Sequence, residues 1–390
     1  MENMVNPPME TIVKTSRIAS ACEQRCLSPG SDITRRSFLS SGVAALAGCA
    51  AMPKKSACAD SVPDFMKSVM LKLGGNNMAD DRWLHDDWPE SKKAKMRVAY
   101  TKLHFDEAIW REATERMAQK GLNVALIDLH EGVEYPRHPE LAVEGSWSPD
   151  KLRDELRRLR GMGILPVPKL NFSTTHSAWQ KKWRYRTSSP EYYRFCEDMI
   201  ADVCEIFDTP PLFHIGMDEE VPIGMSSSPL MIVRQGDLWW HDFLFLVREV
   251  ERRGVRCWVW SDKLWRWEND GDYLRRCPRS VLQSNWFYLA DFSLWRRKFD
   301  PKVIAKGGWG FHQYGPAGYL ELEKAGFDQV PTGSNWYNDA NMGATVDFCR
   351  EHISHTHLKG FMSASWMRCI PEQRERLLAS IDQLSAALRR

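Results

Sequence analysis

The sequence lacks a charge excess of either sign: 53 Lys and Arg stand against 51 Asp and Glu, for a formal net charge of +2. It also lacks the blocks of Lys and Arg that follow a phosphate backbone, so a nucleic-acid partner is not expected. No apolar run approaches the ~20 residues of a membrane-spanning helix. Repeats and low-complexity tracts are absent too, which leaves one large domain as the expected organisation.

Signatures of cofactor and metal binding are also missing. No glycine-rich fingerprint follows the first expected strand, which argues against a dinucleotide-binding sheet. The cysteines of the expected domain show no C-x-x-C or Cys/His metal spacing, and no H-E-x-x-H motif occurs. We therefore expect neither a metal ion nor an organic cofactor.

The N-terminal residues 1–59 read as an export signal and tether. The segment "TRRSFLSSGVAALAGC" joins the twin arginine Arg35-Arg36 to a short apolar run, a pattern typical of twin-arginine export. Its end, "LAGC", resembles a bacterial lipobox, in which Cys49 is lipidated and becomes the mature N-terminus. A rival cleavage site is "ACA" at 57–59. We expect a periplasmic or cell-surface protein that touches the membrane only through a lipid anchor.

The rest of the sequence alternates short apolar or β-branched runs with segments of helical period. Eight runs are expected to be strands: 96–101, 123–129, 164–172, 212–217, 256–262, 281–286, 330–335 and 358–365. Eight strands, each followed by a helix, are the pattern of a (β/α)8 TIM barrel. A doubly wound open sheet is the less favoured alternative. We expect residues 60–95 to be a linker and lid, and residues 96–390 to be the barrel domain.

One stretch, "LFHIGMDEE" (212–220), runs from a buried strand directly into three carboxylates. Active sites of such barrels lie at the carboxyl ends of the strands, which is where Asp218 and Glu219 stand. Two close carboxylates push their pKa values apart, so that one can serve as a general acid while the other stays ionised. The alternative is a solvated acidic turn. We expect Asp218 and Glu219 to be catalytic.

Other polar and aromatic residues follow the remaining strands and should meet the acids at one mouth. His176 is as readily structural as functional, whereas His214, inside its strand, is expected to be structural. The sequence has 17 tryptophans, more than a core requires, and tryptophan faces stack well on sugar rings. The expected binding residues are His176, Trp260, Asp262, Trp286, Tyr337, Asp339 and Trp366.

At these residues the sequence resembles glycoside hydrolase family 20, the β-N-acetylhexosaminidases. "FHIGMDEE" is similar to the family's H-I-G-G-D-E motif, and "VWSDKL", "GSNWYND" and "KGFMSASW" are similar to its segments on strands five, seven and eight. The resemblance implies that Asp218 orients the acetamido group of the sugar and that Glu219 is the general acid and base. Tyr337 would contact the acetamido oxygen, the three tryptophans would wall the subsite, and Asp339 and His176 would bind hydroxyls or tune the acids.

The departures from the family indicate a divergent member. Lys169 and Asn171 occupy the places of two strand-three acids, Leu103 stands near the place of a sugar-binding arginine, and Arg368 replaces a glutamate. Lys169 and Arg368 either recognise an anionic sugar or pair with nearby acids.

Two other functions remain open. The first is a glycosidase with Glu219 as acid and with Asp262 or Glu131 as an enzyme nucleophile. The second is a non-catalytic carbohydrate-binding lipoprotein. A metal enzyme built on His130, Glu131, His176 and Asp218 has no motif to support it.

A lipid anchor at Cys49 can be tested by metabolic labelling with a palmitate analogue. Label should be present in the wild type and absent from Cys49→Ala, because the thiol is the only acylation point that the lipobox provides. The double variant Arg35→Lys, Arg36→Lys should remain in the cytoplasm. Label that persists in Cys49→Ala would contradict the anchor, and normal export of the double variant would contradict the twin-arginine route.

Overall fold

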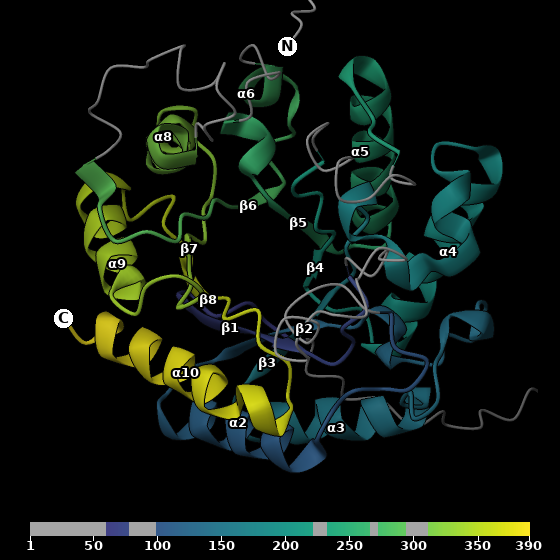
Figure 1. Ribbon diagram of the computed structural model, residues 1–390. Helices are drawn as coiled ribbons and strands as arrows, with labels where there is room; N and C mark the ends of the chain where they lie inside the picture. Colours follow the sequence, from purple (N-terminus) through teal and green to yellow (C-terminus); the bar gives the residue numbers. More distant parts are fainter. Residues whose placement is uncertain (1–59, 78–98, 221–231, 266–271, 294–310) are drawn as a thin grey trace, which may run out of the picture. The chain divides into compact units, whose positions relative to one another are not determined.

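The computed structural model describes residues 60–77, 99–220, 232–265, 272–293 and 311–390. In this part of the chain a ring of parallel strands lies at the centre and helices surround it (Figure 1). The expected signal, with Cys49, lies outside the described residues. The strands are β1 (Met66–Lys72), β2 (Val124–Asp128), β3 (Leu165–Lys169), β4 (Leu212–His214), β5 (Arg256–Trp260), β6 (Leu282–Ser284), β7 (Thr332–Gly333) and β8 (Gly360–Ser363).

The helices lie between the strands in the chain. They are α2 (Glu107–Gln119), α3 (Pro149–Gly161), α4 (Pro190–Ile206), α5 (Gly236–Glu251), α6 (Asp272–Arg276), α8 (Phe311–Lys324), α9 (Asn341–His352) and α10 (Arg374–Leu388). Two of them begin as the sequence predicts. The hydroxyl of Ser148 accepts the N–H of Lys151 ahead of Pro149, and Ser189 caps α4 in the same way. Among the described residues, no helix has the length and apolarity needed to cross a membrane.

The sheet closes into a barrel. Its hydrogen-bonded order is β6-β5-β4-β3-β2-β1-β8-β7, with parallel neighbours throughout. The two ends of this order meet through the parallel bridges Gln283↔Gln329 and Trp286↔Thr332. The expected (β/α)8 TIM barrel is therefore confirmed, and each of the strands β2 to β8 falls inside the run that the sequence predicts for it.

The first strand is not where the sequence predicts it. Residues 66–72 form β1, which pairs with β2 and β8, so this part of the expected linker at 60–95 is a wall of the barrel. The described part of the expected strand at 96–101, residues 99–101, is not a strand. The segment "MKSVMLK" is hard to recognise as a buried strand, because Lys67 and Ser68 interrupt its apolar run and Lys72 ends it, and the compensating charge of Lys72 on Asp128 lies 56 residues further on.

Removal of β1 should abolish folding. Val69, Met70 and Leu71 are fully buried, and burial of three such side chains stabilises a fold by about 5–9 kcal/mol, comparable with the whole stability of a domain. A protein that starts at residue 60 should unfold in one cooperative transition, followed by circular dichroism. A protein that starts at residue 96 should not. Cooperative melting of the shorter protein would show that β1 is dispensable.

Candidate active site

The turn after β4 holds the backbone in a conformation that presents both acids. Gly216, Met217 and Glu219 have φ values of 74°, 75° and 57°, in the left-handed region. A side chain at position 216 cannot fit, because a Cβ there would lie 2.0 Å from Oδ1 of Asn171. Such backbone costs on the order of 1–3 kcal/mol per non-glycine residue, and it persists where the surroundings hold it.

Neighbouring strands supply the groups that hold this turn. The N–H of Gly216 donates to Nδ1 of His214 at 3.0 Å, and the N–H of Met217 donates to Oδ1 of Asn171 at 3.1 Å. The N–H of Glu219 donates to Oδ2 of Asp262 at 3.0 Å, from the end of β5. His214 is thus structural, as expected: burial lowers its pKa well below the usual value, and the neutral ring can accept a hydrogen bond.

The two carboxylates occupy different environments. Asp218 is 4% exposed, and its Oδ1 accepts a hydrogen bond from Nδ2 of Asn171 at 2.7 Å. Glu219 keeps 29% of its side-chain surface exposed. Hydroxyls of the β3 loop secure the peptide groups of both, since Ser173 donates to the carbonyl of Asp218 and Thr175 to that of Glu219, at 2.5 and 2.7 Å. One acid is therefore a fixed buried group, and the other can meet a substrate.

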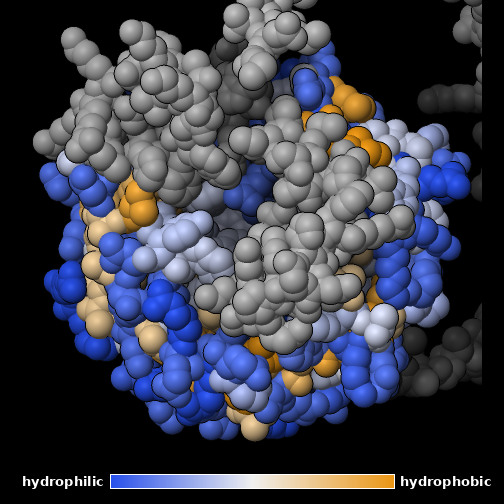
Figure 2. All heavy atoms as spheres, in the orientation of Figure 1, coloured by the Kyte–Doolittle hydropathy of each residue, from blue (hydrophilic) through white to orange (hydrophobic). Residues whose placement is uncertain are grey.

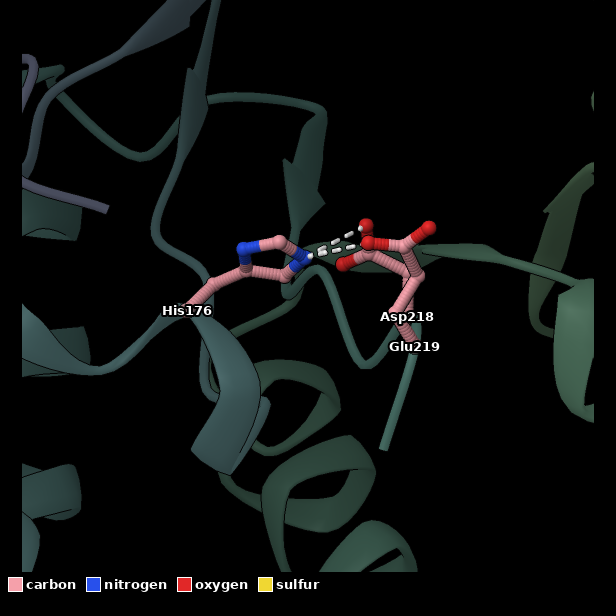
Figure 3. A group of neighbouring side chains, drawn as sticks. All are labelled: His176, Asp218 and Glu219. Atoms are coloured by element: carbon pink, nitrogen blue, oxygen red, sulfur yellow. Dashed lines mark ion pairs between the residues drawn. The ribbon is translucent and has the colours of Figure 1, made fainter. Parts of the chain in front are cut away.

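His176 joins the two acids. Its Nε2 lies 3.1 Å from Oδ2 of Asp218 and 3.4 Å from Oε2 of Glu219, and the ring points at both carboxylates (Figure 3). Burial alone would lower the pKa of His176, but the charges of Asp218 and Glu219 outweigh it and raise the pKa to about 9. In return, the imidazolium outweighs the burial of Asp218 and holds the pKa of that carboxyl well below its usual range.

The same three side chains could in principle hold a divalent ion, since their donor atoms lie within 4.8 Å of one another. Without a bound ion, a pKa of about 9 keeps His176 protonated near neutral pH, so a metal ion would have to displace that proton. The other residues of the weighed metal set lie elsewhere: His130 is 3.0 Å from Asp128, and Glu131 binds the N–H groups of Gly75 and Asn76.

The expected aromatic residues gather on one wall of the barrel. The Trp260 ring lies 4.5 Å from that of His214 and 5.7 Å from that of Trp366, between centroids. Trp366 donates through Nε1 to the hydroxyl of Tyr288 at 3.2 Å, and Tyr288 stacks on Trp286 at 5.0 Å. Trp260 and Trp286 are only 1% and 6% exposed, so both also serve as core.

Tyr288 is a site residue that the sequence reasoning missed. Burial, with the charges of Asp218, Glu219 and Asp262, raises its pKa well above 10, so the phenol is close to the acids and stays neutral. The signal that could have found it is its place two residues after Trp286. Side chains two apart in extended backbone share a face.

Two expected binding residues are not brought to the acids. Tyr337 is 68% exposed and contacts Trp336 edge to face, and it makes no contact with Asp218 or Glu219 in the described structure. Asp339 pairs with Arg376 at 3.1 Å and accepts from Gln383 on α10 at 3.2 Å. In the described structure the carboxylate of Asp339 thus contacts α10 at the surface, and its role in sugar binding stays a prediction.

The remaining charged residues form two buried networks. Lys169 donates to Asp128 at 2.8 Å inside the barrel, and both side chains are fully buried. Of the two expectations for Lys169, pairing with an acid is thus the correct one. Glu220, the third acid after β4, is paired with fully buried Arg234, which also contacts Asp242 at 3.1 Å. This pairing makes Glu220 a structural anchor and leaves Asp218 and Glu219 as the acids of the candidate site.

No protein-family model matches the sequence, and no curated protein sequence matches it. Solved structures do. The β-N-acetylhexosaminidase from Bacteroides fragilis NCTC 9343 is 14% identical with a TM-score of 0.53, over 82% of this chain and 65% of that one. The Streptomyces plicatus N-acetyl-β-hexosaminidase is 11% identical with a TM-score of 0.52, over 82% and 63%.

A third similar structure is the family 20 exo-β-N-acetylglucosaminidase from Vibrio harveyi, which is 15% identical with a TM-score of 0.50, over 85% of this chain and 57% of that one. This chain therefore spans between 57% and 65% of the length of the three enzymes. At these identities the likeness establishes a shared fold. The resemblance to family 20 read from the motifs is confirmed at that level.

The ion pair of His176 should appear in the pH dependence of stability. A folded pKa of about 9, above the unfolded value of about 6.5, contributes stability that is complete below about pH 6.5 and is lost as pH rises through 9. The free energy of unfolding should therefore fall by up to about 1.4 kcal/mol per pH unit across this window. Urea titrations of the wild type and His176→Gln should show a stability difference that shrinks with rising pH.

The control for this experiment is His355→Gln, which changes an exposed histidine outside the site. Its stability difference from the wild type should be small at every pH. A difference between the wild type and His176→Gln that stays constant from about pH 6 to about pH 10 would contradict a buried imidazolium.

Proposed function

We propose that this protein is a glycoside hydrolase that acts on glycans containing N-acetylamino sugars, by a retaining mechanism in which the acetamido group of the substrate takes part. The observation that carries the proposal is the pair of unlike carboxylates after β4: Asp218 is buried and held ionised by His176, and Glu219 is partly exposed beside it. The fold shared with solved β-N-acetylhexosaminidases supports the choice of reaction.

In the proposed reaction Glu219 protonates the glycosidic oxygen as its bond to the anomeric carbon breaks. The carbonyl oxygen of the acetamido group bonds to the same carbon, which gives a cyclic cation that the sugar itself provides. Water then attacks the anomeric carbon, Glu219 takes its proton, and the ring opens with retained configuration. Asp218 accepts the acetamido N–H and stabilises the positive charge, because its carboxylate is already oriented by Asn171 and His176.

The rival mechanism needs an enzyme carboxylate that faces the anomeric carbon. Glu131 is 3% exposed and accepts hydrogen bonds from backbone N–H groups of Gly75 and Asn76. Asp262 is 1% exposed and accepts the N–H of Glu219. Both carboxylates are committed to holding the backbone, which favours a nucleophile supplied by the substrate.

The proposal extends to the partner and place of action. The partner is a carbohydrate, bound against the wall formed by Trp260, Trp366 and Tyr288. The twin arginine and Cys49 support a place of action outside the cytoplasm, on a lipid tether. No cofactor takes part in the proposed reaction.

Hydrolysis of matched aryl glycosides, with and without the N-acetyl group, tests the proposal. Glu219→Gln should reduce kcat on a substrate with a poor leaving group about 10²–10⁴-fold, the usual contribution of general acid–base catalysis. The loss should be smaller with an activated leaving group, which needs less protonation. Asp218→Asn should impair only the N-acetyl substrates, and Glu144→Gln, which changes an exposed acid, should behave as the wild type.

Two outcomes would overturn the proposal. Equal losses of Asp218→Asn on plain glucosides and on N-acetyl substrates would mean that Asp218 does not hold an acetamide. Binding of amino sugars without turnover by the wild type, on any leaving group, would favour the non-catalytic carbohydrate-binding protein.

A further inference from the structure

The barrel mouth carries a second polar cluster, on the wall opposite the acids. In the strand order, β4 is separated from β1 by β2 and β3, and β8 follows β1, so β1 and β8 face β4 across the barrel. Lys72 ends β1, and Arg368 follows β8. A parallel bridge joins the two residues, which places them side by side. The molecular surface is hollowed over the ring of strands, and the atoms visible in the hollow are hydrophilic (Figure 2).

We infer that Lys72 and Arg368 bind an oxyanion on the substrate, a sulfate ester or a carboxylate of the sugar, at the end of the site opposite Glu219. This inference rests on the proposed function and specifies its substrate class. It makes the preferred substrate an acidic amino-sugar glycan rather than a neutral one.

Lys72 is a buried cation whose ion pair with Asp128 is long and not hydrogen-bonded. It is 7% exposed, and its nearest carboxylate oxygen is Oδ2 of Asp128, at 3.9 Å, too far for a hydrogen bond. The other oxygen of Asp128 is already taken by Lys169 at 2.8 Å and by His130 at 3.0 Å. Burial of the ammonium, with the charges of Lys169 and Arg368 nearby, lowers the pKa of Lys72 to about 8 despite Asp128.

Arg368 also lacks a carboxylate partner among the described residues. Its Nη2 donates to the carbonyl of Gly75 at 2.9 Å, and its guanidinium lies 4.9 Å from the centre of the Tyr100 ring. Its Nη1 is 3.5 Å from Nδ1 of His104, whose pKa is lowered by burial and by the charge of Arg368. The neighbours of this guanidinium are therefore neutral groups, which position it without neutralising it.

The local charges do not balance. The charges that act on Lys72 are two cations, Lys169 and Arg368, and two carboxylates, Asp128 and Glu131, so that with Lys72 itself this set has one positive charge in excess. His130 does not add a charge near neutral pH, because burial lowers its pKa to about 4. The carboxylate of Glu131 already accepts hydrogen bonds from the backbone N–H groups of Gly75 and Asn76. A net positive charge in a poorly solvated site is costly, and an anionic ligand would remove that cost.

Trp366 connects this cluster to the reaction centre. Nζ of Lys72 lies 5.5 Å from the centre of the Trp366 ring, and the indole N–H of Trp366 donates to Tyr288, which is close to both acids. A sugar ring held against this wall would place its glycosidic bond at Glu219 and its opposite edge toward Lys72. The oxyanion therefore belongs on the sugar whose bond is cleaved, away from the anomeric carbon.

The test compares three matched aryl glycosides of an N-acetylamino sugar: a neutral one, a sulfated one and one with a carboxylate on the ring. The wild type should prefer one of the anionic substrates about tenfold or more in kcat/KM, the scale of one charge-assisted contact. Lys72→Met and Arg368→Met should each lose that preference, measured as the ratio of kcat/KM between the anionic and the neutral substrate in the same variant. The preference should also shrink with added salt, as exposed parts of the contact are screened.

Two further variants keep the test decisive. Lys72→Arg keeps the charge and should keep the preference, whereas Lys102→Met changes an exposed lysine paired with Glu144 and should have no effect. If Lys72→Met fails to fold, Arg368→Met and Lys72→Arg still report on the cluster. A wild type that favours the neutral substrate, or a preference unchanged in Arg368→Met, would overturn the inference.

Binding measured by calorimetry on Glu219→Gln separates this inference from the proposed function. Anionic amino sugars should bind this variant more tightly than neutral ones even though turnover is lost. Absence of hydrolysis with an intact, Lys72-dependent preference would refute the proposed reaction alone. Hydrolysis with no anionic preference would refute the oxyanion site alone.

Discussion

The ion pair between His176 and Asp218 is the interaction on which the candidate site depends. It joins the β3 loop to the β4 turn, and it keeps charge on two groups that burial would otherwise neutralise. Because the imidazolium offsets one carboxylate, a second one, Glu219, can stand 3.4 Å from it without leaving the cluster strongly anionic. The left-handed turn from Gly216 to Glu219 is tolerated because His214, Asn171 and Asp262 each accept a hydrogen bond from one of its N–H groups.

The barrel below this centre is unusually polar for its position. Lys72, Asp128, Lys169 and His214 are partners in register on β1 to β4, so all four side chains share the inner face of the sheet. Removing Asp128 from this set would cost about 3–5 kcal/mol, because the buried charges of Lys72 and Lys169 would then be left uncompensated. The set therefore ties the strand register to the electrostatics of the mouth. A second buried network is centred on Arg234, which pairs with Glu220 after β4 and with Asp242 on α5.

Sequence reasoning succeeded where the signal is local. The runs for β2 to β8, the serine caps of α3 and α4 and the acids that follow β4 each depend on residues close together in the chain. It failed where a partner from a distant strand changes the meaning of a residue. The segment of β1 was predicted to be part of a linker, because the counter-charge of Lys72 is Asp128, which lies on another strand. The ion pair of Asp339 with Arg376 on α10 was likewise not apparent from the order of the residues.

The sequence by itself determined the class of fold and the place of the acids. A period of alternating strands and helices dictates a parallel barrel, and a barrel brings the carboxyl ends of its strands to one mouth. Only the tertiary structure decided which charges neutralise one another. The charge of Lys169 is neutralised by Asp128 inside the barrel, and that of Asp339 by Arg376 on the surface. Lys72 and Arg368, in contrast, lie side by side, and neither has a hydrogen-bonded carboxylate among the described residues. Electrostatic interactions fall off over a few ångströms, so charge pairing is set by distances in space that the order of residues does not contain.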